Sequence, residues 1–576
     1  MGQFILFNKK SEICPTLIQD YINSYNMNKY IKRTIVNYDL FLFEKTRVNN
    51  INYYEYGDSG IYVTGTIVYK KYSYRMSITR ILHDFVDDAL EPNELIGNYA
   101  VILFHKNKLH LLIDPSNNYY LYYDKGYNII SSSWMAVYKI TQKSSNIINK
   151  QALREILLTG NLIGSETISK DIFKYIREEK ICIDGIEIHN HVPTIKEPCK
   201  SDYEGSVSYQ LEVLSSYFDS VRELCEEFGA SSAITSGLDS RLLFVLLNNR
   251  VKNIQYFTTW RNNNINELIA KEICYIKGYK IVSEKHRPPI DLNSEEFIQR
   301  LHENMFYNDG QIRTHQLWIE EINSENYRNK IIGDKRISIG GVGGEQYRNN
   351  ERLVRGRYHI YDWIKYEYLR KDINKFVLGN NYSEEILENI IRKVKSLLSL
   401  SSDYIDYVII KRFMNEIYNP ANRTLRNNIE NKNYFFLTPF TEYLVSRNAY
   451  LSVNHLGVGF EFEMSMIRRM DPEISRVMTD YGFSLEKREP FYRLGTPVLK
   501  SIVGIPAYNR FKYLFNRNGN LMKSLLEKDN NLSGYINIIE DLNLGINIQK
   551  VKNSDYLSPL LIQSGYLIDK LGMSIE

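Results

Sequence analysis

The stretch that decides the fold is Ala233-Ile-Thr-Ser-Gly-Leu-Asp-Ser-Arg-Leu-Leu-Phe-Val-Leu-Leu247. Small and apolar residues lead into a short polar turn, and a strongly apolar helical pattern leaves it. A strand, a turn rich in hydroxyl groups and a helix N-terminus together favour an anion, because free backbone N–H groups and the helix dipole face it. The pattern therefore predicts a phosphate-binding turn, although an ordinary strand and helix joined by a polar cap has the same local sequence.

The side chains of this turn suit a nucleotide. Gly237 lets the backbone approach a ligand closely, and the neighbouring hydroxyl groups can donate hydrogen bonds to phosphate oxygens. Asp239 is a candidate magnesium ligand, with helix capping as its alternative role. The predicted nucleotide-binding residues of the turn are Thr235, Ser236, Gly237, Leu238, Asp239 and Ser240.

The composition is that of a soluble globular protein with more than one domain. The 576 residues are 43% hydrophobic and 24% charged, and the net charge of +4 is small for that length. This balance gives no argument for nucleic acid, and no apolar run is long enough for a membrane span. Five scattered cysteines argue against a disulfide framework and a structural zinc site. We expect a cytoplasmic protein whose partners include neither nucleic acid nor membrane.

The sequence pattern changes near residue 200. Before it, short alternating runs such as 61–68 predict an antiparallel sheet with hairpins and added helices. Glu187–Ser201, with two prolines, is interpreted as the connection. After it, long amphipathic helices alternate with short apolar strands, which predicts an α/β protein with a parallel sheet wrapped by helices, followed by a helical C-terminal part. The expected domains are residues 1–195 and 200–576.

A second candidate strand leads into glycines and a carboxylate. The segment Ile337-Ser-Ile-Gly-Gly-Val-Gly-Gly-Glu-Gln-Tyr-Arg348 places Gly341 and Gly343 where a backbone can approach a ligand, with Glu345 supplying a charge after them. Between the two turns, residues 254–260 predict a strand and residues 266–277 a helix. This order of elements is what a doubly wound nucleotide fold needs beside its phosphate turn.

Taken in order, these segments resemble the synthetase domain of the asparagine synthetase family. The marks of that family are a Ser-Gly-Gly-x-Asp-Ser loop, a Ser-Gly-x-Gly-Ala-Asp-Glu loop, a Pro-Phe-(Leu)-Asp segment and a late Arg-x-Lys. The corresponding segments here are Thr235–Ser240, Gly340–Gln346, Leu437–Val445 and Ile505–Lys512. The first third is similar to the class II glutaminase half of the same family. Its matching segments are Glu91–Leu103, Leu111–Pro115 and Leu121–Tyr123.

The resemblance implies a fold and a set of residue roles. The N-terminal half would be a glutaminase-like antiparallel sandwich, and the C-terminal half a doubly wound parallel sheet of the ATP-pyrophosphatase type. Asp239 and Glu345 would bind magnesium, and Phe257 and Thr258 would flank the adenine or ribose. Lys512 matches the late lysine that steadies the adenylation transition state, with Lys500 as its rival. The implied catalytic residues are Lys512, Asp239 and Glu345, with ATP and magnesium as cofactors.

Two departures from the family pattern carry information. A working class II glutaminase uses an N-terminal cysteine as its nucleophile, whereas residue 2 here is Gly2, which excludes glutamine hydrolysis by that mechanism unless the start is misassigned. Glu345 and Gln346 stand where the family has Asp and Glu. A degenerate glutaminase half beside a retained synthetase half is similar to β-lactam synthetases and lasso-peptide cyclases.

The predicted function is ATP-dependent amide-bond formation without glutamine hydrolysis. A substrate carboxylate, on a small molecule or a peptide, would be adenylated with release of pyrophosphate and then passed to an amine with loss of AMP. The alternatives are a lasso-peptide-type macrolactam cyclase, an ammonia-dependent asparagine synthetase, and a non-catalytic ATP-binding scaffold. The loop Asn308–His315 is a candidate acceptor pocket in which Arg313 would hold a carboxylate. A homodimer or a pathway partner is compatible with the sequence.

Overall fold

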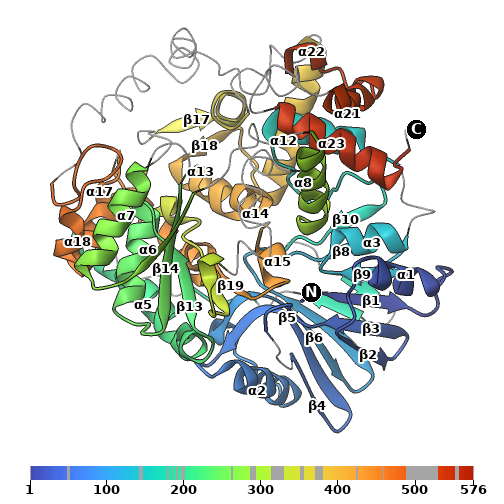
Figure 1. Ribbon diagram of the computed structural model, residues 1–576, viewed down its shortest axis with the longest axis horizontal. Coiled ribbons are helices and arrows are strands. Elements are labelled where there is room, and N and C mark those ends of the chain that lie inside the picture. Colours follow the sequence, from blue (N-terminus) through green and yellow to red (C-terminus); the bar gives the residue numbers. More distant parts are fainter. Residues whose placement is uncertain are drawn as a thin grey trace.

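The protein combines two antiparallel-rich sheets with a parallel sheet and many helices (Figure 1). In the part of the chain that the structure describes, no helix is long and apolar enough to cross a membrane. The computed structural model describes residues 2–48, 52–141, 147–177, 181–183, 186–189, 192–195, 202–260, 264–285, 294–312, 330–349, 356–369, 380–422, 426–457, 459–487, 489, 530–551 and 557–574.

The N-terminal strands form two six-stranded sheets that pack face to face around a shared apolar core. The first sheet has the order β10-β8-β9-β1-β3-β2. Its strands are β1 (Phe4–Asn8), β2 (Tyr30–Ile35), β3 (Tyr38–Phe43), β8 (Tyr122–Asp124), β9 (Ile129–Ser131) and β10 (Ile172–Lys174). The second has the order β11-β12-β7-β6-β5-β4. Its strands are β4 (Tyr53–Tyr56), β5 (Ser59–Tyr69), β6 (Leu95–His105), β7 (Lys108–Ile113), β11 (Ile181–Ile183) and β12 (Ile186–His189).

The connection between the two parts of the chain begins later than predicted. Glu187, placed in the connection by its mixed surroundings, lies in β12, which pairs in parallel with β7. Its neighbour Ile186 is buried, because this strand lies inside the sheet between β11 and β7. Short helices accompany the N-terminal sheets, and α2 packs on β5. They are α1 (Thr16–Ser24), α2 (Tyr74–Val86), η1 (Pro92–Glu94), α3 (Trp134–Ile140) and α4 (Lys150–Thr159).

The predicted parallel sheet is present, so the α/β class is confirmed. Its five strands have the order β15-β14-β13-β16-β19, and each neighbouring pair is parallel. The helix α6 after β13 is apolar on nearly every side, and its buried leucines explain why this stretch determines the local fold. The elements are α5 (Tyr203–Phe228), β13 (Ala230–Ala233), α6 (Leu238–Asn248), β14 (Ile254–Trp260), α7 (Ile265–Ile276), β15 (Ile281–Lys285), α8 (Ser294–Tyr307), β16 (Ile337–Ile339), η5 (Gly344–Tyr347) and β19 (Phe435–Leu437).

The remaining elements are mainly helical, as predicted. The segment Tyr404–Ile417, predicted as one helix, instead begins as the short strand β18, continues as a helix and ends in a π-helical turn. The elements are β17 (Arg357–His359), α10 (Ile360–Trp363), η6 (Ile364–Tyr368), α12 (Asn380–Leu397), β18 (Tyr404–Asp406), α13 (Tyr407–Phe413), η7 (Met414–Tyr418), α14 (Asn419–Asn422), α15 (Arg426–Asn431), η8 (Pro439–Thr441), α16 (Tyr443–Tyr450), η9 (Val453–His455), α17 (Glu461–Met470), α18 (Pro472–Arg476), α21 (Asn530–Asp541), α22 (Ile548–Val551) and α23 (Ser558–Leu571).

Buried polar contacts join the N-terminal sheets to the segment that carries α15 and β19, which lie next to each other in Figure 1. Asn428 is 1% exposed; its Oδ1 accepts from the Tyr120 N–H at 2.7 Å, and its Nδ2 donates to the carbonyls of Tyr120 and Ser132, both at 2.9 Å. The Nζ of buried Lys45 donates to the carbonyl oxygen of Asn431 at 2.6 Å. Because such contacts are directional and buried, they fix the two parts of the chain in one arrangement.

Candidate functional site

The predicted phosphate turn lies at the point where the parallel sheet reverses its strand order. From β13 the chain moves outward through β14 to β15, and then returns to the other side of β13 as β16. The strands β13 and β16 are direct neighbours, so both turns that follow them emerge at the same edge of the sheet. In open α/β sheets the crevice at such a reversal is the usual place for a ligand.

The turn after β13 is held in shape by its own hydroxyl groups. Ser240 Oγ lies 2.8 Å from Thr235 Oγ1 and accepts a hydrogen bond from the Thr235 N–H at 3.1 Å. The Ser236 hydroxyl donates to Asn266 at the start of α7. The helix α6 begins after Gly237, and no side chain caps it. Its first-turn N–H groups are therefore left for another acceptor, which fits the predicted phosphate.

The glycine turn after β16 presses against the start of α6. A Cβ atom on Gly344 would lie 2.6 Å from Asp239 Oδ1, and one on Gly341 would lie 3.5 Å from the Asp239 carbonyl oxygen. Gly343 has a φ of +95°, a conformation that residues with a Cβ rarely adopt. The structure thus brings the predicted residues Gly341, Gly343 and Asp239 together at one edge of the sheet.

Asp239 is bound by an arginine that the sequence analysis did not assign. Arg348 Nη2 lies 3.0 Å from Asp239 Oδ1, and Arg348 Nη1 lies 3.1 Å from Glu463 Oε2. Glu463, in α17, is fully buried, whereas the Asp239 side chain is 28% exposed. Burial lowers the pKa of Arg348, but Glu463 and Asp239 outweigh it and raise that pKa above its ordinary value. Burial likewise raises the pKa of Glu463 well above its ordinary value, and Arg348 opposes this.

The second predicted carboxylate is deeply buried. Glu345 is 4% exposed, and its carbonyl oxygen accepts a hydrogen bond from Lys411 Nζ at 3.3 Å. The same ammonium donates to the Arg348 carbonyl oxygen at 2.7 Å. The amide of Gln346 accepts from Asn415 in η7 at 3.1 Å. The α13–η7 segment therefore holds the glycine turn through hydrogen bonds from Lys411 and Asn415.

The residues present fit a magnesium nucleotide with one rearrangement. Asp239 is the exposed carboxylate of the turn, and it must exchange the Arg348 guanidinium for the metal ion. Arg348 would keep a contact with Glu463 during that exchange, because its Nη1 lies 3.1 Å from Glu463 Oε2. Within the described ranges, no group of three or more histidine, cysteine or acidic side chains is placed to hold a metal. A metal ion here would thus depend on ligand oxygens such as those of phosphates.

The strand β14 lies beside the turn as predicted. Phe257 pairs with Ala233 in the sheet, and its carbonyl oxygen accepts from the Ile234 N–H at 2.9 Å. Thr258 is 1% exposed, and its hydroxyl group has no hydrogen-bond partner among the described residues. Phe257 and Thr258 therefore lie on the strand next to the phosphate turn.

Other predicted residues lie outside the described part of the chain. These are Lys512, its rival Lys500, and Arg313 of the candidate acceptor loop. Arg348 closes the glycine motif in sequence, only three residues after Glu345, so its position was a usable signal. Glu463 gave no such signal, because nothing in the helix Glu461–Met470 distinguishes one acid from the next.

Neighbouring residues occupy the space around Gly2. Gly2 is buried, and its N–H donates to the Lys432 carbonyl oxygen at 2.8 Å. A Cβ atom on Gly2 would lie 2.7 Å from Lys45 Cγ and 2.8 Å from the Asn431 carbonyl oxygen. A nucleophilic side chain at this position would collide with both neighbours.

Comparisons with known proteins leave this chain without an assigned family. No protein-family model matches it, and no curated protein matches it. Among solved structures, it is similar to the U34-tRNA thiolase NcsA from Methanococcus maripaludis with its [4Fe-4S] cluster. The identity is 11%, the match covers 57% of this chain and 87% of that chain, and the TM-score is 0.20. A TM-score this low does not establish a shared fold.

Proposed function

We propose that the protein is an ATP-dependent ligase of the asparagine synthetase type that forms amide bonds without hydrolysing glutamine. It would adenylate a substrate carboxylate with release of pyrophosphate and pass the acyl group to an amine with release of AMP. The observation that carries this proposal is the meeting of the hydroxyl-rich turn and the glycine turn at the reversal of the parallel sheet, with Gly344 packed directly on Asp239.

The groups of the site match the demands of this reaction. Adenylation needs phosphate charge to be neutralised and two reactants to be aligned, with little covalent work by side chains. The uncapped N-terminus of α6 would bind the pyrophosphate part of ATP, together with the hydroxyl groups of Thr235 and Ser236. Asp239 would hold magnesium, which supplies charge neutralisation when bound. Glu345 and Lys512 keep the predicted roles of second carboxylate and transition-state lysine.

The packing around Gly2 supports the absence of a glutaminase step. A cysteine Cβ atom would lie 2.7 Å from Lys45 Cγ and 2.8 Å from the Asn431 carbonyl oxygen, and in the proposed reaction the amine comes from the substrate or another donor. This separates the proposal from a glutamine-dependent asparagine synthetase. A macrolactam cyclase and a small-molecule ligase share the same adenylation chemistry, and the identity of the carboxylate distinguishes them.

The test is substrate-dependent release of AMP and pyrophosphate from magnesium ATP. The wild-type protein is assayed with a panel of carboxylates and amines, alongside Asp239→Ala and the matched surface variant Asp219→Ala. Asp219 is exposed on α5 and lies outside the site. We expect Asp239→Ala to reduce AMP release on the order of a hundredfold or more, and Asp219→Ala to leave it unchanged. Equal activity of the two variants would remove Asp239 from the mechanism.

A second candidate is a scaffold that keeps the fold without catalysis. The ion pair between Arg348 and Asp239 favours it, because the carboxylate is already neutralised by the protein. Binding of magnesium ATP separates the two candidates. The ligase predicts that magnesium strengthens ATP binding and that Asp239→Ala abolishes this effect. A protein that binds no nucleotide, or binds it equally with and without magnesium, would support the scaffold.

A further inference from the structure

A buried arginine lies behind the phosphate turn. Arg241 is the fourth residue of α6, and its side chain is 0% exposed. Its Nη1 donates to the Val477 carbonyl oxygen at 2.7 Å. Its Nη2 donates to the carbonyl oxygens of Met478 at 3.0 Å and of Ser236 at 3.4 Å. One guanidinium group therefore links the phosphate turn to the segment that follows α18.

The charge of this guanidinium group is not matched by a buried carboxylate. All the hydrogen bonds that Arg241 makes with described residues go to main-chain carbonyl oxygens. Burial lowers the pKa of Arg241 to about 10, and Asp480 and Glu272 oppose this effect. Both acids are exposed, so water screens them. The side chain is therefore charged at neutral pH and lies in the interior without an ion-pair partner among the described residues.

Such a charge calls for an anion nearby. Buried charges are normally paired, because the interior does not solvate them as water does. Carbonyl dipoles replace part of the lost solvation, but they carry no net negative charge. Arg241 Nε is also without a hydrogen-bond partner among the described residues. An anion bound at the phosphate turn would supply the missing negative charge from the other side of the turn.

The turn has one face toward Arg241 and another face that carries its hydroxyl groups. Ser236 is buried, whereas Thr235, Gly237 and Ser240 are half-buried. The peptide bond between Ser236 and Gly237 is trans, so the Gly237 N–H points away from the Ser236 carbonyl oxygen. On that opposite side, Thr235 Oγ1 lies 3.3 Å from the Gly237 nitrogen and 2.8 Å from Ser240 Oγ. Arg241 thus contacts the turn from the side away from its hydroxyl groups.

The contact with Ser236 fixes the direction of a carbonyl group. A carbonyl oxygen that faced a bound phosphate would repel it, whereas N–H and hydroxyl groups donate hydrogen bonds to it. Because Arg241 Nη2 holds the Ser236 carbonyl oxygen inside the protein, the half-buried face presents donors. The same guanidinium group places a positive charge behind those donors.

The segment at the other end of this contact is held by its own hydrogen bonds. In the hairpin 477–485, the N–H and hydroxyl groups of Thr479 donate to the Phe483 carbonyl oxygen at 3.0 and 2.7 Å. The Leu485 N–H donates to the Ser475 carbonyl oxygen in α18 at 2.8 Å. Arg241 therefore ties the phosphate turn to a hairpin that is anchored on a neighbouring helix.

We propose that Arg241 is a positioning residue for phosphate binding. It holds the turn Thr235–Ser240 in the form that accepts an anion, and it does so from the side opposite the ligand. The ligand class is a phosphate or pyrophosphate group. The role of Arg241 in adenylation rests on the proposed ligase function, whereas the preference of the turn for an anion follows from the contacts of Arg241 alone.

The test is binding of inorganic pyrophosphate to the full chain by titration calorimetry in the presence of magnesium. Arg241→Gln keeps N–H donors but removes the charge, and it should weaken pyrophosphate binding at least about tenfold. Arg241→Lys keeps the charge, but one ammonium group cannot span the turn and the hairpin as the guanidinium group does. It should weaken the binding at least about threefold.

Two control variants separate this role from general effects of charge and stability. Arg222→Gln removes an exposed arginine of α5, and Asn428→Ala removes buried hydrogen bonds outside the turn. Both should bind pyrophosphate within about twofold of the wild type. Thermal denaturation identifies any variant that fails to fold. If Arg241→Gln unfolds, Arg241→Lys decides the question.

Three results would overturn the proposal. The first is wild-type affinity for pyrophosphate in the folded Arg241 variants. The second is an equal loss of affinity in Asn428→Ala, which would assign the effect to destabilisation. The third is the absence of pyrophosphate binding by the wild-type protein at millimolar concentration.

The ligase function is judged separately, by AMP release from magnesium ATP. Pyrophosphate binding that depends on Arg241, without AMP release across the substrate panel, would remove the ligase and keep the phosphate site. AMP release that the Arg241 variants retain in full would remove the role of Arg241 and leave the ligase in place.

Discussion

Replacing Gly344 by alanine tests whether the two turns form one site. The new Cβ would lie 2.6 Å from Asp239 Oδ1, 2.8 Å from its Cγ and 2.9 Å from its Cβ. Rotation of the Asp239 side chain relieves the first two contacts but not the third, since Cβ is fixed to the backbone. The first turn of α6 or the glycine turn must therefore shift. Overpacking of this kind costs about 1–3 kcal/mol of folding stability.

Gly341→Ala is the matched control for stability, because the nearest atom to its Cβ would be 3.5 Å away, an ordinary contact. Urea denaturation should show a loss of about 1–3 kcal/mol for Gly344→Ala and a change within about 0.5 kcal/mol for Gly341→Ala. Displacement of Asp239 should also weaken the binding of magnesium ATP to Gly344→Ala. Each 1.4 kcal/mol of lost binding free energy lowers the affinity about tenfold. Equal stability of the two variants would refute the close packing of the turns.

Three further outcomes follow from buried groups outside the nucleotide turns. Asn428→Ala should lower the free energy of unfolding by about 2–4 kcal/mol, because it leaves three backbone groups of the N-terminal part without hydrogen-bond partners. A loss below about 0.5 kcal/mol in denaturation would contradict that bridging role. Burial raises the pKa of Asp114 to about 7 and that of Glu442 well above its ordinary value, so both are favoured protonated in the fold. Stability should hence fall as pH rises from about 4 to 7, and less steeply in Glu442→Gln; a rise over that range would reverse the sign. Gly2→Cys should destabilise the protein by about 1–3 kcal/mol and yield no glutaminase activity, and measurable glutamate release would contradict the packing at Gly2.

Local sequence patterns predicted the parallel sheet and its turns because their signals are short-range. A hydroxyl-rich turn between an apolar strand and an apolar helix can be recognised within fifteen residues of sequence. The observed strand β13 and helix α6 lie on either side of this turn, close to the predicted positions. The glycines of the second turn also carry their own signal. That the turns meet depends on strand order, which arises from long-range pairing of β13 with β16 and is not encoded in either segment.

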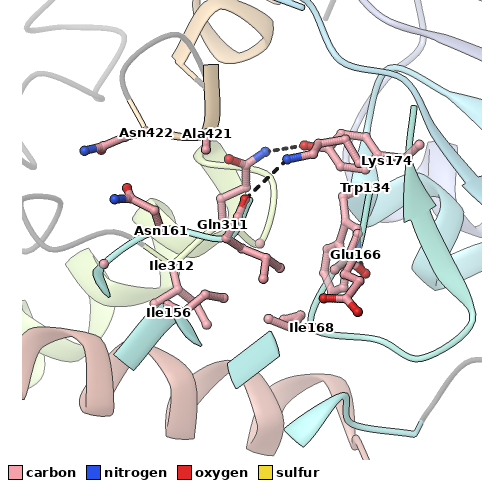
Figure 2. A pocket seen from close by; sticks show the side chains of 15 residues that line it. Trp134, Ile156, Asn161, Glu166, Ile168, Lys174, Gln311, Ile312, Ala421 and Asn422 are labelled. Atoms are coloured by element: carbon pink, nitrogen blue, oxygen red, sulfur yellow. Dashed lines mark hydrogen bonds between the residues drawn. The ribbon is translucent and has the colours of Figure 1, made fainter. Parts of the chain in front are cut away.

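The contact between Arg348, the partner of Asp239, and Glu463 could not be predicted from local sequence patterns. Arg348 and Glu463 are separated by more than a hundred residues, and the packing of both α17 and η5 against α6 brings them together. The same holds for a pocket whose lining residues Trp134, Ile156, Gln311 and Ala421 come from four separate segments of the chain (Figure 2). Tyr404–Ile417 failed as a single helix for a related reason: Tyr404–Asp406 pairs with β17, a tertiary contact that overrides the local helical pattern.

The contacts at residue 2 give the N-terminal sheets a structural role. The carbonyl oxygens of Asn431 and Lys432, from the segment before β19, occupy the space around Gly2 and accept from Lys45 and from Gly2 itself. The next strand, β19, is an edge strand of the parallel sheet beside β16 and the glycine turn. Loss of the N-terminal sheets would leave these buried groups unsatisfied and release that edge. In the proposed ligase the N-terminal part therefore supports the segment beside the glycine turn, which is a structural task that needs no cysteine.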